Sequence, residues 1–184
     1  DGVVITRFNA QGQVLARWGT RGDGPGQFGS DWYGVGGLAV MPDGTVVAGD
    51  PAHALTFSVN SPVDEVDAAP GNAICATPSG TCTLRAAIQE ANVVLGDDII
   101  TLPAGTFQLT LVGTGDNASV TGDLDVQQAL DITGAGPDAT VIDGLGADRV
   151  FHVISGTRLA LSGLAVTNGA APASGGGAIF HDGM

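Results

Sequence analysis

The chain has 184 residues, 43% of them hydrophobic, and its 19 acidic residues against six arginines and no lysine give a net charge of −13. This hydrophobic content supports a packed core and excludes a wholly disordered chain. The acidic balance excludes nucleic acid as a partner, and no apolar run approaches the roughly 18 to 20 residues that span a bilayer. With 30 glycines and only 5% aromatic residues, the composition favours thin, repetitive layers of small side chains.

Residues 1–52 read as two consecutive antiparallel β-hairpins. The first joins residues 3–8 to residues 13–18, whose apolar residues alternate, and the second joins residues 37–40 to residues 45–48 through an Asp-Gly turn. The order of these segments resembles the NHL repeat, a β-propeller blade unit. The matching stretches are Ile-Thr-Arg-Phe at 5–8, Trp-Gly at 18–19, Gly-Pro-Gly-Gln-Phe at 24–28 and Gly-Leu-Ala-Val-Met-Pro-Asp-Gly at 37–44. Since a propeller closes from several blades and barely one is present, the resemblance implies blade-like strands without the function of a propeller.

Two cysteines, Cys75 and Cys82, enclose a loop that contains Pro78 and Gly80. A loop this short brings two sulfur atoms together readily, so we expect a disulfide, which forms in an oxidising compartment. Free thiols and a zinc site are the alternatives. Zinc needs four ligands, and the nearest histidine in the sequence is His53.

From about residue 53 the pattern changes to one helix and many short strands. Residues 83–95 carry apolar residues at helical spacing, with Thr83 as the N-cap and Gly96 after the last turn. A strand at 55–59 precedes this helix. Further strands, separated by Gly, Asp and Asn, are predicted at 99–102, 106–111, 123–126, 130–133, 140–142, 150–154, 158–161 and 164–167.

Two segments recur at similar spacings. Leu-Asp-Ile-Thr-Gly at 130–134 returns 29 residues later as Leu-Ala-Leu-Ser-Gly, and Val-Ile-Asp-Gly at 141–144 returns 25 residues later as Val-Thr-Asn-Gly. A period in the twenties with short β segments predicts a parallel β-solenoid, in which each coil pairs with the coil below it. An antiparallel sandwich of similar strands is the alternative.

This part of the chain also resembles the CSLREA domain of secreted bacterial and archaeal surface proteins. The match includes Phe-Ser-Val-Asn-Ser at 57–61, Cys-Thr-Leu-Arg-Ala-Ala-Ile-Gln-Glu-Ala-Asn at 82–92, Asp-Asp-Ile-Ile-Thr-Leu-Pro-Ala-Gly-Thr-Phe at 97–107 and Gly-Gly-Gly-Ala-Ile at 175–179. Ala86 replaces the acidic residue of the eponymous motif. The resemblance implies a mainly β fold: over residues 53–184, a right-handed parallel β-helix with the fold of pectin-degrading enzymes, capped at its N-terminal end by the helix at 83–95. It also implies secretion to an extracellular or cell-surface location.

Carboxylates are the candidates for chemistry. Asp123 and Asp125 lie two apart on a predicted strand and therefore share a face, with Asp116 nearby. Three interpretations stay open: a solvated face of an acidic protein, which we favour, a calcium site formed by the three aspartates, or an acid/base pair for glycoside hydrolysis. Calcium is thus the one cofactor suggested. His152 alternates with Phe151 and is expected to face outward.

The remaining polar residues have less specific roles. Arg85 is expected to pair with Glu90 or with the acidic loop at 64–67, and Arg149 and Arg158 with surface aspartates such as Asp148 or Asp138. Asn117 begins an Asn-Ala-Ser glycosylation sequon, which matters only in a host that glycosylates.

The function expected first is a non-catalytic extracellular structural module, a stalk or fibre subunit of a microbial surface. A polysaccharide-binding or polysaccharide-degrading β-helix protein and a calcium-dependent adhesion module are the alternatives. Beyond residue 53 the aromatic residues are all phenylalanine, whereas sugar-binding platforms usually use tryptophan or tyrosine, so the structural role is favoured.

Self-assembly is expected because both ends of the chain look unfinished. Unpaired β edges join to whatever edge fits them, and a head-to-tail contact of this kind propagates into a homopolymer or filament. A longer single chain whose later coils are missing here is the alternative. The residues expected to form the assembly contact are Val3, Ile5, Phe8, Val14, Leu15, Trp18, Ile179 and Phe180.

Overall fold

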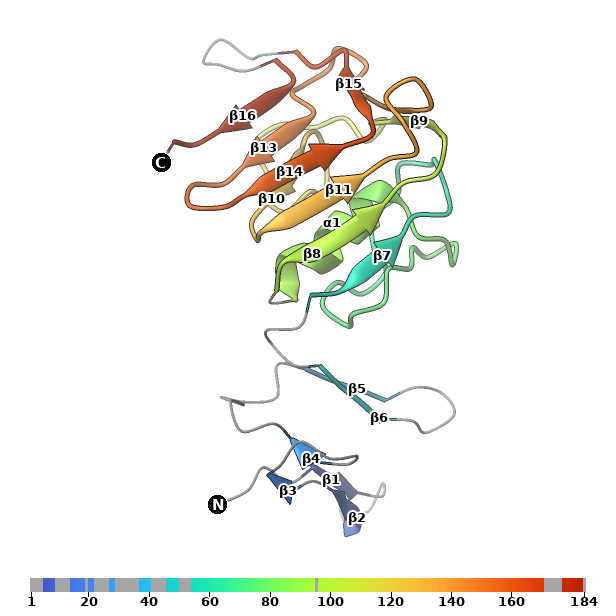
Figure 1. The fold of residues 1–184 in the computed structure, drawn as a ribbon, viewed down its shortest axis with the longest axis vertical. Helices are drawn as coiled ribbons and strands as arrows, with labels where there is room; N and C mark the ends of the chain where they lie inside the picture. The colour runs from blue at the N-terminus through green and yellow to red at the C-terminus, as the bar shows by residue number, and fades with distance from the viewer. Residues whose placement is uncertain are drawn as a thin grey trace.

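A computed structural model gives the fold of residues 54–94, 96–170 and 177–183, together with the backbone of six short strands in the N-terminal part (Figure 1). In these described residues the protein is mainly β, with one α-helix and, beyond residue 54, three short parallel sheets. The predicted mainly β class is therefore confirmed.

The N-terminal strands are β1 (Ile5–Phe8), β2 (Val14–Trp18), β3 (Thr20–Arg21), β4 (Gln27–Phe28), β5 (Gly37–Val40) and β6 (Val46–Gly49). β1 pairs antiparallel with β2, and β5 with β6, at the places of the two predicted hairpins. β3 and β4 form a short parallel pair in the glycine-rich segment, where the sequence predicts no strand. Six residues of the expected assembly contact belong to this part of the chain, where the structure describes no side chains: Val3, Ile5, Phe8, Val14, Leu15 and Trp18.

Beyond residue 54 the chain visits three parallel sheets in the same order three times (Figure 1). The first sheet contains β7 (Thr56–Ser58), β8 (Asp98–Thr101), β11 (Leu130–Thr133) and β14 (Leu159–Ser162). The second contains β9 (Gly105–Gln108), β12 (Thr140–Asp143) and β15 (Ala165–Thr167). The third contains β10 (Leu124–Val126), β13 (Phe151–Val153) and β16 (Ile179–His181). Each strand pairs with the strand from the preceding visit.

The register of these pairs places the apolar side chains of neighbouring strands one above another in the core. One column consists of Phe57, Ile100, Ile132 and Leu161, and a second consists of Phe107, Ile142 and Val166. Burial alternates along β8, so Ile100 is buried while its neighbour Ile99 is 37% exposed. Complete burial of each such side chain contributes about 1.5 to 3 kcal/mol, so these columns stabilise the fold.

Helix α1 (Leu84–Val93) closes the core next to β8 and β10. It begins where predicted, because the Thr83 hydroxyl accepts a hydrogen bond from the Ala86 N–H at 3.1 Å. It ends at Val93, two residues before the predicted end, because Val94 is already extended. Ala87, Ile88 and Ala91 insert into the hydrophobic core.

The structure corrects one of the two predicted repeats. Leu130 pairs with Leu159, so the 29-residue echo is confirmed. Ile142 rather than Val141 pairs with Val166, so the 25-residue echo is wrong by one position. A shift of one residue moves every side chain of a strand to the opposite face, and only the observed register buries Ile142.

Candidate functional site

Two of the predicted site residues, Asp123 and Asp125, meet His152 on the outer face of the third sheet. β10 carries Asp125 directly beside His152 of β13, and Asp123 precedes β10. The carboxylates of Asp123 and Asp125 and the imidazole of His152 each place one ligand atom within 4.8 Å of the others. The three residues are only 3%, 0% and 7% exposed, so the favoured interpretation of a solvated acidic face is wrong. We call these three residues the Asp–Asp–His cluster.

Asp125 is held by hydrogen bonds on both carboxylate oxygens. Oδ1 lies 3.0 Å from Nδ1 of His152, and Oδ2 accepts the Ser119 N–H at 2.9 Å. The Ser119 hydroxyl also bonds the backbone of Asp125, so the segment before β10 folds back over this strand. Burial raises the pKa of Asp125 to about 6 despite these bonds, and the charge of Asp123 adds to the effect.

Asp123 forms an ion pair with Arg149, which lies shortly before β13. The Arg149 Nε atom donates to Oδ2 of Asp123 at 2.9 Å, and the guanidinium lies 4.9 Å from the ring centre of Phe180. Burial raises the pKa of Asp123, and the positive charge of Arg149 opposes that shift. Phe180, an expected assembly residue, thus packs against Arg149, while Ile179 is 43% exposed at the edge strand β16. The predicted pairing of Arg149 with Asp148 or Asp138 is therefore wrong, because Arg149 pairs with Asp123.

Asp116 does not join the Asp–Asp–His cluster, which corrects the predicted set of calcium ligands. Its carboxylate caps its own loop by accepting the backbone N–H groups of Ala118, Val120 and Thr121 and the Thr121 hydroxyl, at 2.8 to 3.1 Å. Burial alone would raise the pKa of Asp116, but these four hydrogen bonds outweigh it and lower the pKa. Asn117, in the same loop, is exposed.

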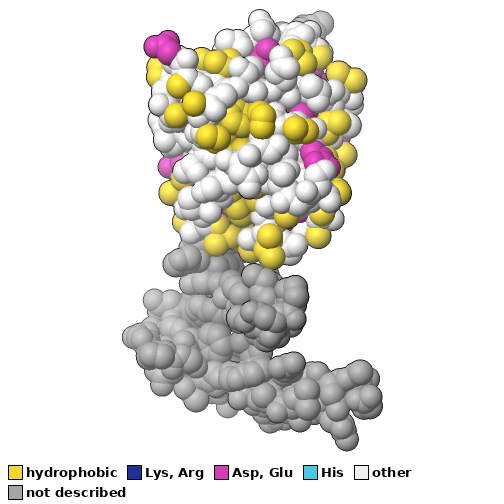
Figure 2. Space-filling view, turned by 90° about the vertical axis from the view of Figure 1, so that its right-hand side faces the viewer, with side chains coloured by type: hydrophobic (Ala, Val, Ile, Leu, Met, Phe, Trp, Pro, Cys, Tyr) yellow, Lys and Arg dark blue, Asp and Glu magenta, His cyan; other side chains and the backbone are white. Residues whose placement is uncertain are grey.

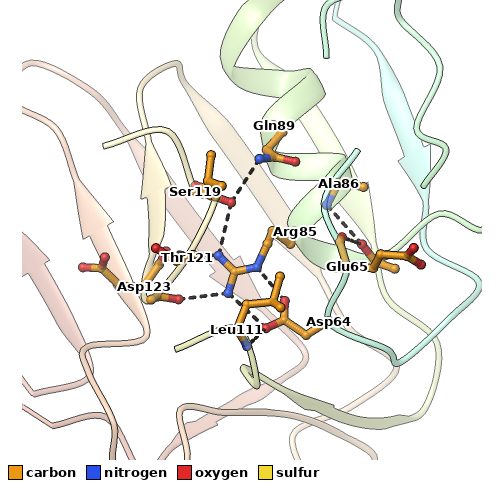
Figure 3. A network of polar contacts seen from close by, with 12 residues as sticks. Asp64, Glu65, Arg85, Ala86, Gln89, Leu111, Ser119, Thr121 and Asp123 are labelled. Carbon is orange, nitrogen blue, oxygen red and sulfur yellow. Dashed lines mark hydrogen bonds and ion pairs between the residues drawn. The ribbon is translucent and has the colours of Figure 1, made fainter. Parts of the chain in front are cut away.

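A second polar network surrounds Arg85 of α1 (Figure 3). Its side chain is completely buried, and its Nε and Nη2 atoms donate to the two carboxylate oxygens of Asp64 at 2.6 and 3.1 Å. The guanidinium also donates to the carbonyl oxygens of Ser119 and Gly122. The predicted pairing of Arg85 with the acidic loop at 64–67 is thus confirmed, and the alternative pairing with Glu90 is wrong. Gly122 has φ +69, and a Cβ there would lie 2.4 Å from the Gly113 carbonyl oxygen, so glycine is required.

Glu90, on the same helix, binds the loop that precedes α1. Its two carboxylate oxygens accept the backbone N–H groups of Gly71 and Ala73, each at 2.9 Å. Burial raises the pKa of Glu90 to about 7 in spite of these bonds. The same loop contains a disulfide between Cys75 and Cys82, with Cα atoms 5.1 Å apart. The helix is therefore tied to its preceding loop by covalent and polar links.

One shallow pocket lies beside the cluster. It has a volume of about 200 Å³ and is lined mainly by apolar and glycine residues of the segments at 109–114 and 144–149, with Asp148 and Arg149 at one side. Within the described residues, no helix has both the length and the apolar character that a membrane crossing requires.

Comparisons with protein-family models, with curated proteins and with solved structures found no match. The resemblances to the CSLREA domain and to the NHL repeat therefore stay predictions. Nothing beyond the geometry described above assigns a role to the Asp–Asp–His cluster. The sequence pattern missed His152 and Arg149 as partners of these aspartates, because both lie more than 25 residues away in the sequence and only the register of β10 with β13 brings them close.

Proposed function

We propose that residues 53–184 begin a right-handed parallel β-helix that serves as a non-catalytic structural module, a secreted stalk or fibre subunit of a microbial surface. The repeated order in which the chain visits its three parallel sheets supports this fold. Helix α1 covers the first coils, as a cap of such a stack requires, and the disulfide suits an extracellular protein.

The observation that carries the proposal is that the buried ionic groups bind parts of the protein to one another. Arg85 of α1 bonds Asp64 in the loop before the helix and the carbonyl oxygen of Gly122 in the segment before β10. The Asp–Asp–His cluster bonds β10 to β13. These side chains face other parts of the protein instead of a cleft. On the face shown in Figure 2, acidic side chains stand singly among hydrophobic and uncharged groups. Such a distribution favours a structural role over the binding of a charged polysaccharide.

The last coil offers an edge for assembly. Leu159, Leu161 and Val166 are partly exposed, whereas the residues one coil below them in the same columns, Leu130, Ile132 and Ile142, are fully buried. Among the described residues, β14, β15 and β16 each pair on one side only. An edge with free backbone groups and apolar side chains accepts a further strand, so we propose that a second copy supplies it end to end.

The mass of the full chain in solution tests this assembly. Static light scattering over a range of concentrations is expected to show masses that grow with concentration. Leu161→Lys places a charge at the open end of the core and should reduce the mass to that of a monomer. Ile99→Lys, on the outer face of β8, is the matched control and should leave the growth unchanged. A monomer at every concentration contradicts the proposal, and a version without residues 1–50 shows whether that segment supplies the second edge.

An enzyme assay tests the non-catalytic part of the proposal separately. The chain is incubated with a panel of acidic polysaccharides, and unsaturated or reducing sugar ends are measured. We expect no release. Release that disappears in Asp123→Asn and Asp125→Asn variants would replace the structural role with a polysaccharide-degrading one.

A further inference from the structure

His152 lies between two carboxylates. Its Nδ1 atom is 3.0 Å from Oδ1 of Asp125, and its Nε2 atom is 3.1 Å from Oδ1 of Asp182, which follows β16. The Nε2 atom is buried and makes no hydrogen bond. Both ring nitrogens therefore face carboxylate oxygen atoms, one from the fully buried Asp125 and one from Asp182, whose side chain is 38% exposed.

A neutral imidazole does not satisfy this arrangement. It carries one proton, so one of its nitrogens must direct a lone pair towards its surroundings, where each nitrogen has a carboxylate oxygen about 3 Å away. A buried lone pair beside an anion is unfavourable unless a cation lies between them or the ring takes a second proton.

The charge of the surroundings also calls for a cation. Asp123, Asp125 and Asp182 bring three negative charges, and Arg149 bonds only one of these carboxylates, Asp123. With a neutral His152 the group has a formal charge of −2, and the nearby Asp148 adds to the repulsion at Asp123. One divalent cation would neutralise this charge.

We propose that Asp123, Asp125 and the imidazole of His152 bind a divalent transition metal of the zinc class. Two atoms that each coordinate one ion at about 2.1 Å lie about 3 to 4 Å apart, close to the 3.0 Å between Asp125 Oδ1 and His152 Nδ1. All three ligand atoms lie within 4.8 Å of one another, so small side-chain movements bring them onto one ion. A ligand set of one imidazole and two carboxylates suits zinc better than calcium, which prefers oxygen atoms only.

Metal binding competes with Arg149 for Asp123. The guanidinium is already stacked on Phe180, so it can release the carboxylate and keep that contact. The site joins β10 to β13 and is independent of end-to-end assembly, so failure of one proposal leaves the other standing.

Calorimetric titration of the chelator-treated full chain with ZnCl₂, MnCl₂ or CaCl₂ tests the site. We expect one zinc ion per chain, bound at least about tenfold more tightly than calcium. His152→Asn should weaken zinc binding by about tenfold or more, and Arg149→Gln should strengthen it by removing the competitor. His181→Asn, which changes an exposed histidine of β16, is the control and should leave the affinity unchanged.

Three results would overturn the proposal. The first is the absence of saturable zinc binding up to about 1 mM zinc, because a dissociation constant above that concentration means negligible affinity. The second is a zinc affinity that neither His152→Asn nor Arg149→Gln changes, because the ion then binds elsewhere. The Arg149→Gln result decides this even if the His152→Asn variant folds poorly. The third is tighter binding of calcium than of zinc, which assigns the site to a cation that prefers oxygen ligands only.

Discussion

Replacing Arg85 with methionine tests whether the buried network of Figure 3 holds the cap on the sheets. The side chains of Arg85 and Asp64 are 0% and 2% exposed. Methionine fills most of the space but leaves the Asp64 carboxylate without a counter-ion and the Ser119 and Gly122 carbonyl oxygens without donors. Removal of one partner from a buried ion pair costs about 3 to 5 kcal/mol, so we expect the free energy of unfolding to fall by that amount.

The assay is urea denaturation followed by far-ultraviolet circular dichroism, which reports on the backbone, because the sequence beyond residue 54 contains no tryptophan. Arg158→Met is the control. Arg158 is 50% exposed and pairs with Asp131 and Asp97 at the surface, so its loss should cost less than about 1 kcal/mol. Equal, small losses in both variants would refute the role given to Arg85.

Three further predictions concern the same fold. Changing Cys75 and Cys82 to serine should lower the free energy of unfolding by about 2 to 3 kcal/mol, and mass spectrometry of the native chain should find no alkylatable thiol. Because the pKa of Glu90 is raised from 4.5 to about 7, its contribution is complete below pH 4.5 and is lost as the pH rises through 7, so the melting temperature should fall over this range. A Glu90→Gln variant should show a flatter pH profile. Ile100→Ala should cost about 2 to 5 kcal/mol in urea denaturation, and Ile99→Ala, on the exposed face of the same strand, much less.

Local patterns in the sequence predict the elements well. Helix α1 follows from apolar residues at helical spacing after the N-cap Thr83, and nine of the ten strands beyond residue 54 fall at predicted segments. The exception is β16, whose three residues Ile-Phe-His follow a glycine-rich stretch and lack a clear alternation. Spacing and turn formers also indicate the disulfide of Cys75 with Cys82.

The candidate site follows from contacts between neighbouring parallel strands, which local patterns do not encode. Asp125 and His152 are 27 residues apart, and their contact depends on the register of β10 with β13. The burial of Asp125 depends in addition on Ser119, which lies in an irregular segment folded back over the strand. The error of one position between Val141 and Val166 shows how little a repeat in the sequence constrains such a register.

Hydrogen exchange of the edge strands, measured by mass spectrometry at increasing protein concentration, tests end-to-end assembly most directly. The backbone amides of β14, β15 and β16 should become protected as the concentration rises, because a second copy pairs with their free edges. The amides of β11, β12 and β13, which already pair on both sides, should exchange at a constant rate. Equal exchange of the edge strands at every concentration would contradict assembly through the open coil.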